Sequence, residues 1–159
     1  AEPVRMEPDT TSGDHMRINS ILTHKGDDVA TVTPDSTVAD ALRALADHGI
    51  GALVVSSDGR AVEGILSERD IVRALAADGA VTLEHPVAQL MTDTVVTCTR
   101  EDTVDSLMAT MTERRVRHVP VVEAGVLSGI ISIGDVVKHR VGELESETRH
   151  LKDYITTGR

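Results

Sequence analysis

The chain has 159 residues, of which 40% are hydrophobic and one, Tyr154, is aromatic. Its net charge of −10 at pH 7 argues against binding to nucleic acid or to an anionic membrane, because both need a basic protein surface. A single cysteine, Cys98, excludes an internal disulfide and any multi-cysteine metal site, and it fits a soluble protein of the cytoplasm. No apolar run approaches the roughly 18 residues that span a bilayer, so no membrane partner is expected.

The N-terminal segment, residues 1–15, is polar, contains two prolines and shows no hydrophobic periodicity. We therefore expect a disordered extension or the remnant of a tag. His15 followed by Met16 also has the form of a cloning scar ahead of a natural start at Met16. The boundaries expected for the rest are 16–77 for a first domain with a lead-in helix, 78–141 for a linker and a second domain, and 142–159 for the continuation of a C-terminal helix.

An internal repeat organises the chain after this segment. The residues that begin at Val32 align with those that begin at Cys98, an offset of 66 residues. In each copy they lead into a helix, which apolar residues at i, i+4 and i+7 predict. Thr37 and Thr103 stand at the expected N-cap positions, and Gly49 is expected to end the first helix.

Two short β-rich runs follow in each copy, at 52–55 and 64–66 and again at 119–122 and 129–131. A Ser-x-x-Asp turn then opens a second helix, from Ser67 to Asp70 in the first copy and from Ser132 to Asp135 in the second. The predicted fold class is α/β (α+β), with two βαββα-type units. A unit of about 60 residues buries little surface alone. The two units are therefore expected to pack through their sheets with pseudo-two-fold symmetry and to leave a ligand cleft between them.

A long amphipathic helix is predicted at the C-terminus. Its apolar positions follow a 4, 3, 4, 3, 4 spacing, typical of a heptad seam, at Val137, Val141, Leu144, Thr148, Leu151 and Ile155. Two interpretations stay open, because the stripe can pack on its own domain or against a second subunit. We favour the second and predict a homodimer.

The Ser-x-x-Asp turns are the main candidate site. Either turn alone is an ordinary helix cap. Their duplication at equivalent positions favours a ligand, since Asp70 and Asp135 can accept hydrogen bonds from ribose hydroxyls while Ser67 and Ser132 meet a phosphate at the positive end of a helix.

The segment Arg117-His118 adds fixed and titratable positive charge beside any phosphate, although it can also be a solvated strand end. The first copy has Gly51-Ala52 at the matching place, so two unequal clefts are expected.

Signals for catalysis are missing from the sequence. It contains no glycine-rich phosphate loop, no pair of helical histidines flanking a glutamate, and no recognisable Ser, His and Asp arrangement. We therefore expect no enzyme activity, no metal site and no required cofactor.

Two copies of Gly-Ile-Leu/Ile-Ser-x-x-Asp-Ile/Val-Val, each preceded by Thr-Val at the first helix, resemble the CBS (cystathionine-β-synthase) domain pair, also called a Bateman module. The stretch from Arg115 to Val122 is the most family-like. The resemblance implies a stand-alone, bacterial-type member or a module cut from a larger protein. It further implies disk-like dimers and regulatory binding of AMP, ADP, ATP, S-adenosylmethionine or NAD(H), with the output passing to an unknown effector protein.

The family pattern also implies roles for individual residues. It places the two aspartates at ribose, the two serines beside phosphate, and Arg117 and His118 at phosphate. Thr33 and Thr99 would contact base or phosphate. The expected adenine walls are 52–54, which contains Val54, and 119–121, which contains Val119 and Pro120. The alternative function is an interaction and dimerisation module that binds no ligand.

Overall fold

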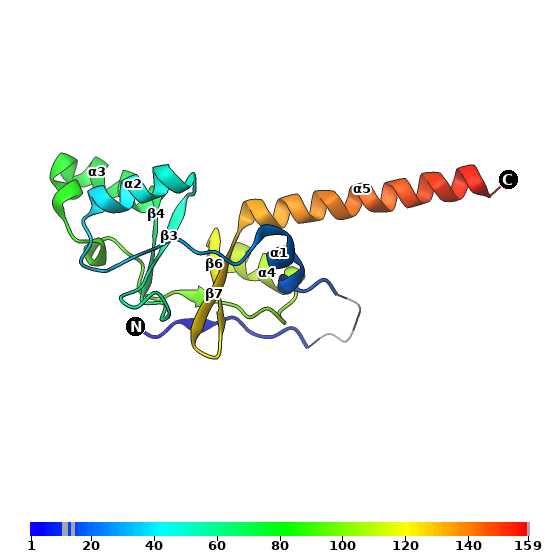
Figure 1. The fold of residues 1–159 in the computed structure, drawn as a ribbon, viewed down its shortest axis with the longest axis horizontal. Coiled ribbons are helices and arrows are strands. Elements are labelled where there is room, and N and C mark those ends of the chain that lie inside the picture. The colour runs from blue at the N-terminus through cyan, green and yellow to red at the C-terminus, as the bar shows by residue number, and fades with distance from the viewer. Residues whose placement is uncertain (11–12, 14, 159) are drawn as a thin grey trace.

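The computed structural model describes residues 1–10, 13 and 15–158, and it contains two copies of one βαββα unit followed by a long helix (Figure 1). The first copy consists of β2 (Thr31–Val32), α2 (Val38–His48), β3 (Ala52–Val55), β4 (Gly64–Ser67) and α3 (Glu68–Asp78). The second consists of β5 (Val96–Thr97), α4 (Val104–Arg114), β6 (His118–Glu123), β7 (Val126–Ser132) and α5 (Ile133–Thr157). The βαββα units predicted from the repeat are therefore confirmed.

Strand pairing is equivalent in the two copies. In the first, β2 is parallel to β3 and β3 is antiparallel to β4. In the second, β6 is antiparallel to β7, and Cys98, just after β5, forms a parallel bridge with Val121 of β6. A hydrophobic cluster with members from both copies, including Val54 and Val95, joins the two sheets. This packing confirms that the copies associate through their sheets.

The helix ends follow the capping residues in the sequence. The Thr37 side chain accepts a hydrogen bond from the Asp40 backbone nitrogen at 3.1 Å, and Gly49 ends α2 in the left-handed conformation. The Asp40 carboxylate binds Arg43. Ser67 and Ser132 each form a complete capping box with the aspartate three residues later.

The lead-in segments cross over between the two copies. Helix α1 (Ile18–Lys25) buries Ile18 and Leu22 in the core of the second copy, whereas Val87, in the short 3₁₀ helix η2 (Val87–Gln89), lies in the core of the first. A second 3₁₀ helix, η1 (Gly79–Glu84), precedes it. Each lead-in segment therefore packs in the core of the other copy. The boundaries at 16 and 78 instead grouped each lead-in segment with the copy that follows it in the sequence.

The expected disorder of residues 1–15 is wrong for the N-terminal part of this segment. Strand β1 (Val4–Arg5) pairs in parallel with β5, and Met6 is only 4% exposed within the core of the second copy. The Thr103 hydroxyl also donates to the Asp9 carboxylate at 3.1 Å. The error has a physical cause, because a two-residue strand gives no periodicity and draws its stability from a long-range partner. The interpretation of His15 and Met16 as a cloning scar is not tested by the structure and stays a prediction.

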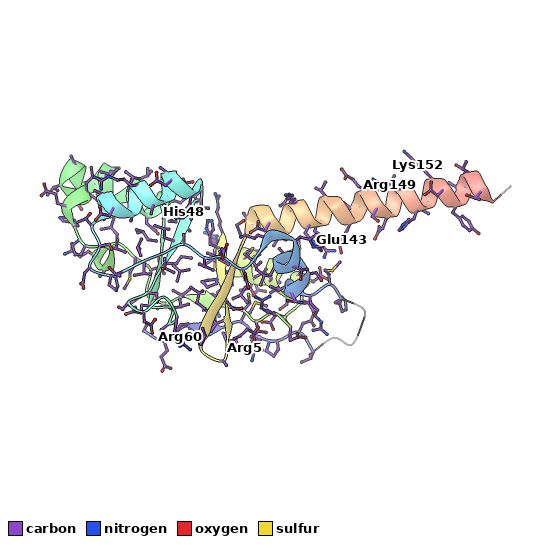
Figure 2. The ribbon with its side chains drawn as sticks, viewed as in Figure 1. Arg5, His48, Arg60, Glu143, Arg149 and Lys152 are labelled. Atoms are coloured by element: carbon purple, nitrogen blue, oxygen red, sulfur yellow. The ribbon has the colours of Figure 1, made fainter. Side chains whose placement is uncertain are left out.

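Helix α5 begins against α1 and α4 and then extends well beyond the two copies (Figure 1). Figure 2 shows the Arg149 and Lys152 side chains on this free part. Within the described residues, no helix is both long enough and apolar enough to cross a membrane.

Candidate functional site

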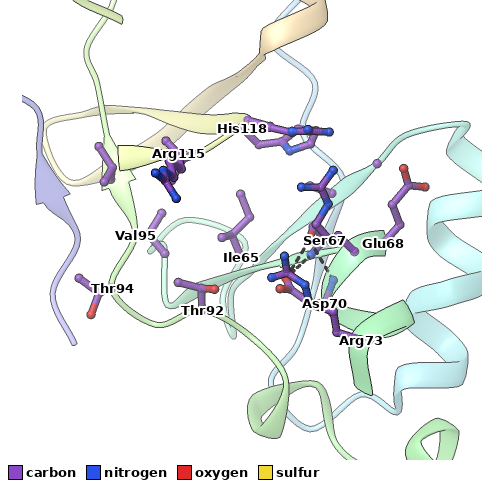
Figure 3. A pocket seen from close by; sticks show the side chains of 16 residues that line it. Ile65, Ser67, Glu68, Asp70, Arg73, Thr92, Thr94, Val95, Arg115 and His118 are labelled. Carbon is purple, nitrogen blue, oxygen red and sulfur yellow. Dashed lines mark hydrogen bonds between the residues drawn. The ribbon is translucent and has the colours of Figure 1, made fainter. Parts of the chain in front are cut away.

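Two clefts lie between the copies, and each combines the Ser-x-x-Asp turn of one copy with segments of the other. Cleft one has a volume of about 340 Å³ and contains the turn from Ser67 to Asp70. Residues 92–96, which lead into β5, and 115–118, which lead into β6, face this turn (Figure 3). Side chains far apart in the sequence are thus brought together around one cavity.

The Asp70 carboxylate in cleft one is held in place but is not neutralised. Its Oδ2 atom accepts hydrogen bonds from the Ser67 backbone nitrogen and the Ser67 hydroxyl, both at 2.9 Å. Among the described residues, Asp70 takes part in no ion pair. Both of these hydrogen bonds use Oδ2, so the Oδ1 atom can still accept hydrogen bonds from hydroxyl donors of a ligand.

Arginine side chains dominate the charge of cleft one. Arg69 and Arg73 lie one turn apart on α3, while Arg115 and Arg117 come from the segment before β6. The carboxylates lining the same cavity are Glu68 and Asp70, so four guanidinium groups outnumber two carboxylates. Guanidinium groups bind phosphate oxygens in pairs of parallel hydrogen bonds, which makes this cleft suited to an anionic ligand.

His118 lines both clefts. Burial lowers its pKa below the ordinary value of 6.5, and the nearby Lys25 ammonium lowers it further, while Asp135 and Glu68 oppose the shift. The imidazole is therefore mainly uncharged at neutral pH. A negatively charged ligand nearby would favour its protonated form.

Cleft two has a volume of about 750 Å³ and contains Ser132 and Asp135. Residues 28–30, before β2, and 48–52, around the start of β3, provide the opposite walls. These segments occupy the positions that 94–96 and 114–118 hold in the other copy, as the offset of the repeat requires.

The Asp135 carboxylate in cleft two already binds a cation. The Lys25 ammonium lies 2.6 Å from Asp135 Oδ2 and also donates to the Ile130 carbonyl at 2.7 Å. Burial alone would raise the pKa of Asp135, but the hydrogen bonds from Lys25 and Ser132 outweigh burial and lower it below 3.8. Asp135 is therefore paired with a cation, whereas Asp70 takes part in no ion pair among the described residues.

The two clefts also differ in the residues at equivalent positions. Offsets of 65 and 66 residues relate the four arginines of cleft one to Gly134, Lys138, Gly49 and Gly51. Of these, only the two glycines near β3 line cleft two. Asp28 adds a further carboxylate there, so cleft two lacks the cationic character of cleft one.

The structure brings some of the predicted site residues together and leaves others apart. Ser67, Asp70, Arg117 and His118 meet in cleft one, and Ser132 and Asp135 meet in cleft two with the same histidine. Arg117 thus faces the turn of the other copy.

Five predicted site residues line neither cleft, namely Thr33, Val54, Thr99, Val119 and Pro120. The Thr33 hydroxyl pairs with Ser36 at 2.9 Å, and Val54 and Val119 are completely buried in the core. Pro120 is also buried, and Thr99 lines a separate cavity beside Arg5. Ligand contacts for these five residues stay predictions that the geometry does not favour.

Sequence reasoning missed four charged residues, Lys25, Arg69, Arg73 and Arg115. Arg69 and Arg73 carry a detectable signal, because one lies within the first Ser-x-x-Asp turn and the other follows it by one helical turn, where the second copy has Gly134 and Lys138. Lys25 carries no local signal, since it lies 110 residues from Asp135 in the sequence.

Comparisons with a family model, with sequence relatives and with solved structures all identify CBS domains. The CBS domain family model matches residues 19–77 and 87–142. The mitochondrial CBS domain-containing protein CBSX3 of Arabidopsis thaliana is 34% identical over 165 residues, covering 99% of this chain and 79% of the relative.

Two solved structures extend the comparison. A CBS-domain containing protein of Agrobacterium tumefaciens is 50% identical, with a TM-score of 0.76 over 79% of this chain and 99% of that one. A CBS domain protein of Pyrobaculum aerophilum, complexed with AMP, is 27% identical, with a TM-score of 0.71 over 84% and 99% of the two chains. The repeat, its strand order and these matches agree, and the chain belongs to the CBS domain family as a tandem pair of CBS domains.

Proposed function

We propose that this chain is a regulatory, non-catalytic module that binds an adenosine nucleotide in cleft one. One observation carries the proposal. A single cavity between the two domains contains both the Asp70 carboxylate, which forms no ion pair among the described residues, and four arginine side chains. A nucleotide has the complementary parts, because its ribose offers two hydroxyl donors and its phosphates offer several anionic acceptors.

Each part of the nucleotide has a matching group in cleft one. The free oxygen of Asp70 accepts from the ribose hydroxyls, and the N-terminus of α3 with Arg73 attracts the phosphates. Ile65 and Val95 supply apolar surface for the base. The AMP complex of the Pyrobaculum relative supports the adenosine class of ligand.

We further propose that cleft one is the nucleotide site of each chain and that cleft two takes no phosphorylated ligand. The Lys25 ammonium neutralises Asp135, and Asp28 adds negative charge to a cavity that arginine does not line. A polyphosphate entering cleft two would lose hydration without gaining guanidinium partners.

Nucleotide binding in cleft one is expected to change the arrangement of the two domains. Because cleft one has walls from both domains, a bound nucleotide favours one arrangement of the pair over others. The signal would then pass to an effector protein or between two copies of the chain. A homodimer through α5 is part of the proposal, since the apolar stripe of this helix is exposed. The single buried cysteine suits a reducing compartment such as the cytoplasm.

Isothermal titration calorimetry with adenosine, AMP, ATP and GTP tests the proposal. We expect AMP and ATP to bind at least about tenfold more tightly than adenosine, because the phosphates gain charge-assisted hydrogen bonds of about 1.5–3 kcal/mol each. GTP should bind less tightly than ATP if the base contributes to recognition. No heat with any nucleotide at millimolar concentration would contradict the proposal and would favour the alternative of a ligand-free assembly module, which the exposed stripe of α5 also supports.

A further inference from the structure

The free part of α5 carries an uncovered apolar seam. Val141, Leu144, Leu151 and Ile155 share one stripe and are between 49% and 71% exposed. The start of the helix is fixed to its own domain, since Val136 is buried and Arg140 binds Asp105 of α4. Beyond this anchor the helix projects away from both copies (Figure 1), which leaves the seam exposed, and the seam fits the face of a partner helix.

The residue types along this seam indicate how many helices would pair. The spacing assigns Val141, Thr148 and Ile155 to heptad position a, and all three are β-branched. Position d holds Leu144 and Leu151. β-Branched residues at a with leucine at d favour a parallel, two-stranded coiled coil. Thr148 is tolerated there because its hydroxyl already donates to the Leu144 carbonyl at 2.8 Å.

The flanking charges distinguish a parallel from an antiparallel pair. Glu147 falls at position g and Lys152 at the next position e. In a parallel pair, each Glu147 faces Lys152 of the other copy, which gives two attractive contacts. An antiparallel pair with the same core positions would set Glu147 against Glu147 and Glu145 against Glu145. Glu147 and Lys152 take part in no ion pair among the described residues, so both are free for a partner.

We propose that α5 pairs in parallel and in register with α5 of a second copy along residues 141–155. This inference rests on the proposed homodimer and adds its surface, orientation and register. A parallel pair places both CBS domain pairs at the same end of the coiled coil. Ser132 and Asp135 cap the start of α5 and also line cleft two. In each copy, the helix of the coiled coil therefore begins directly at the wall of cleft two.

The first experiment tests the seam. Light scattering on the full chain is expected to show a dimer, and Leu151→Glu is expected to weaken association at least tenfold by placing a charge at position d. Ser146→Glu, on the exposed outer face at position f, is the matched control and should leave the dimer unchanged. A dimer that is insensitive to Leu151→Glu would overturn this inference and leave the homodimer standing, whereas a monomeric wild type would overturn both. Nucleotide binding by Leu151→Glu should equal that of the wild type, so cleft one is tested separately.

The second experiment tests orientation. In a parallel pair, position 151 faces itself, so Leu151→Cys alone should form a disulfide-linked dimer under mild oxidation. The wild type is the control, because Cys98 is buried and burial raises its pKa. An antiparallel pair would instead set position 151 against position 141 and form the cross-link only in mixtures of Leu151→Cys with Val141→Cys. That result would overturn the proposal.

A charge exchange gives an independent test of register. Glu147→Lys and Lys152→Glu should each weaken the dimer severalfold, and the double variant should restore it. Failure of the double variant to recover would overturn the predicted contact between Glu147 and Lys152.

Discussion

The two clefts of this CBS domain pair are built from equivalent segments but have different electrostatic properties. In cleft one the capping aspartate takes part in no ion pair among the described residues, and four arginines line the cavity. In cleft two the equivalent aspartate binds Lys25, and three of the four arginines have glycine as their counterpart. Both aspartates have a structural role at the helix starts, because each completes a capping box. Capping alone therefore does not indicate a ligand site. The two turns differ in the charged side chains around them, and this difference favours cleft one as the nucleotide site.

The largest expected difference between the clefts concerns their aspartates. Asp70→Ala should weaken ATP binding about 100-fold or more, because the lost hydrogen bonds to a charged acceptor contribute about 1.5–3 kcal/mol each. Asp135→Ala should change the affinity by less than about twofold. Each substitution also removes a capping-box contact that stabilises the fold by about 1 kcal/mol, and Asp135→Ala additionally breaks the ion pair with Lys25, so affinity is compared only after both variants are shown to be folded. Calorimetry measures both, and equal losses would abolish the distinction between the clefts.

A smaller effect is expected from the arginines. Arg73→Gln should lower ATP affinity about tenfold and lower AMP affinity less, because the polyphosphate makes more charged contacts. Its counterpart in the second domain, Lys138, is exposed and lines neither cleft, so Lys138→Gln should bind ATP like the wild type. Titrations at two salt concentrations add a second readout, since the wild type should lose more affinity in high salt than Arg73→Gln. An unchanged ATP affinity in Arg73→Gln would contradict the proposal that Arg73 of α3 contacts the phosphates.

The pH dependence of binding tests His118. Its pKa in the free protein lies below 6.5, so lowering the pH from 7.5 toward 5.5 raises the protonated fraction of His118 and adds positive charge to cleft one. We expect His118 to contribute about a threefold gain in affinity for an anionic nucleotide over this range, as a single screened charge would. His118→Gln should lose this gain, and the comparison between the two proteins cancels the titration of the nucleotide itself. Identical pH profiles would place the phosphates away from His118.

The smallest expected effect concerns the ion pair in cleft two. Because the pKa of Asp135 is lowered in the folded protein, the pair stabilises the fold above pH 3.8, and this contribution is lost as the pH falls through the folded pKa. Lys25→Met should therefore lower the free energy of unfolding by about 1 kcal/mol at pH 7. The difference from the wild type should shrink in acid. Urea unfolding checks this, with Arg43→Met as control, since it breaks an exposed pair with Asp40 and should change little.

The sequence predicted those features that depend on local pattern or on the repeat. The units, the caps at Thr37 and Ser67 and the heptad seam of α5 all follow from residue spacing. Features that depend on contacts between distant segments could not be predicted from the sequence. Examples are the burial of Met6 and the packing of each lead-in segment in the core of the other copy.

The same division applies to the site. Asp70 and Asp135 could be found from the duplicated turn, and Arg117 from its contrast with Gly51. Lys25 could not, because only the folded chain brings it to Asp135. The predicted contacts of Val54 and Val119 with adenine are not favoured, because Val54 is completely buried in the cluster that joins the two sheets and Val119 is completely buried in the core of the second domain.

The most direct test of the difference between the clefts is a crystal structure of the chain with ATP. We predict nucleotide in cleft one, with the ribose hydroxyls at Asp70, the phosphates within reach of Arg73 and Arg117, and the contact between Lys25 and Asp135 intact. Nucleotide bound at Asp135 in cleft two, with Lys25 displaced and cleft one empty, would contradict the account.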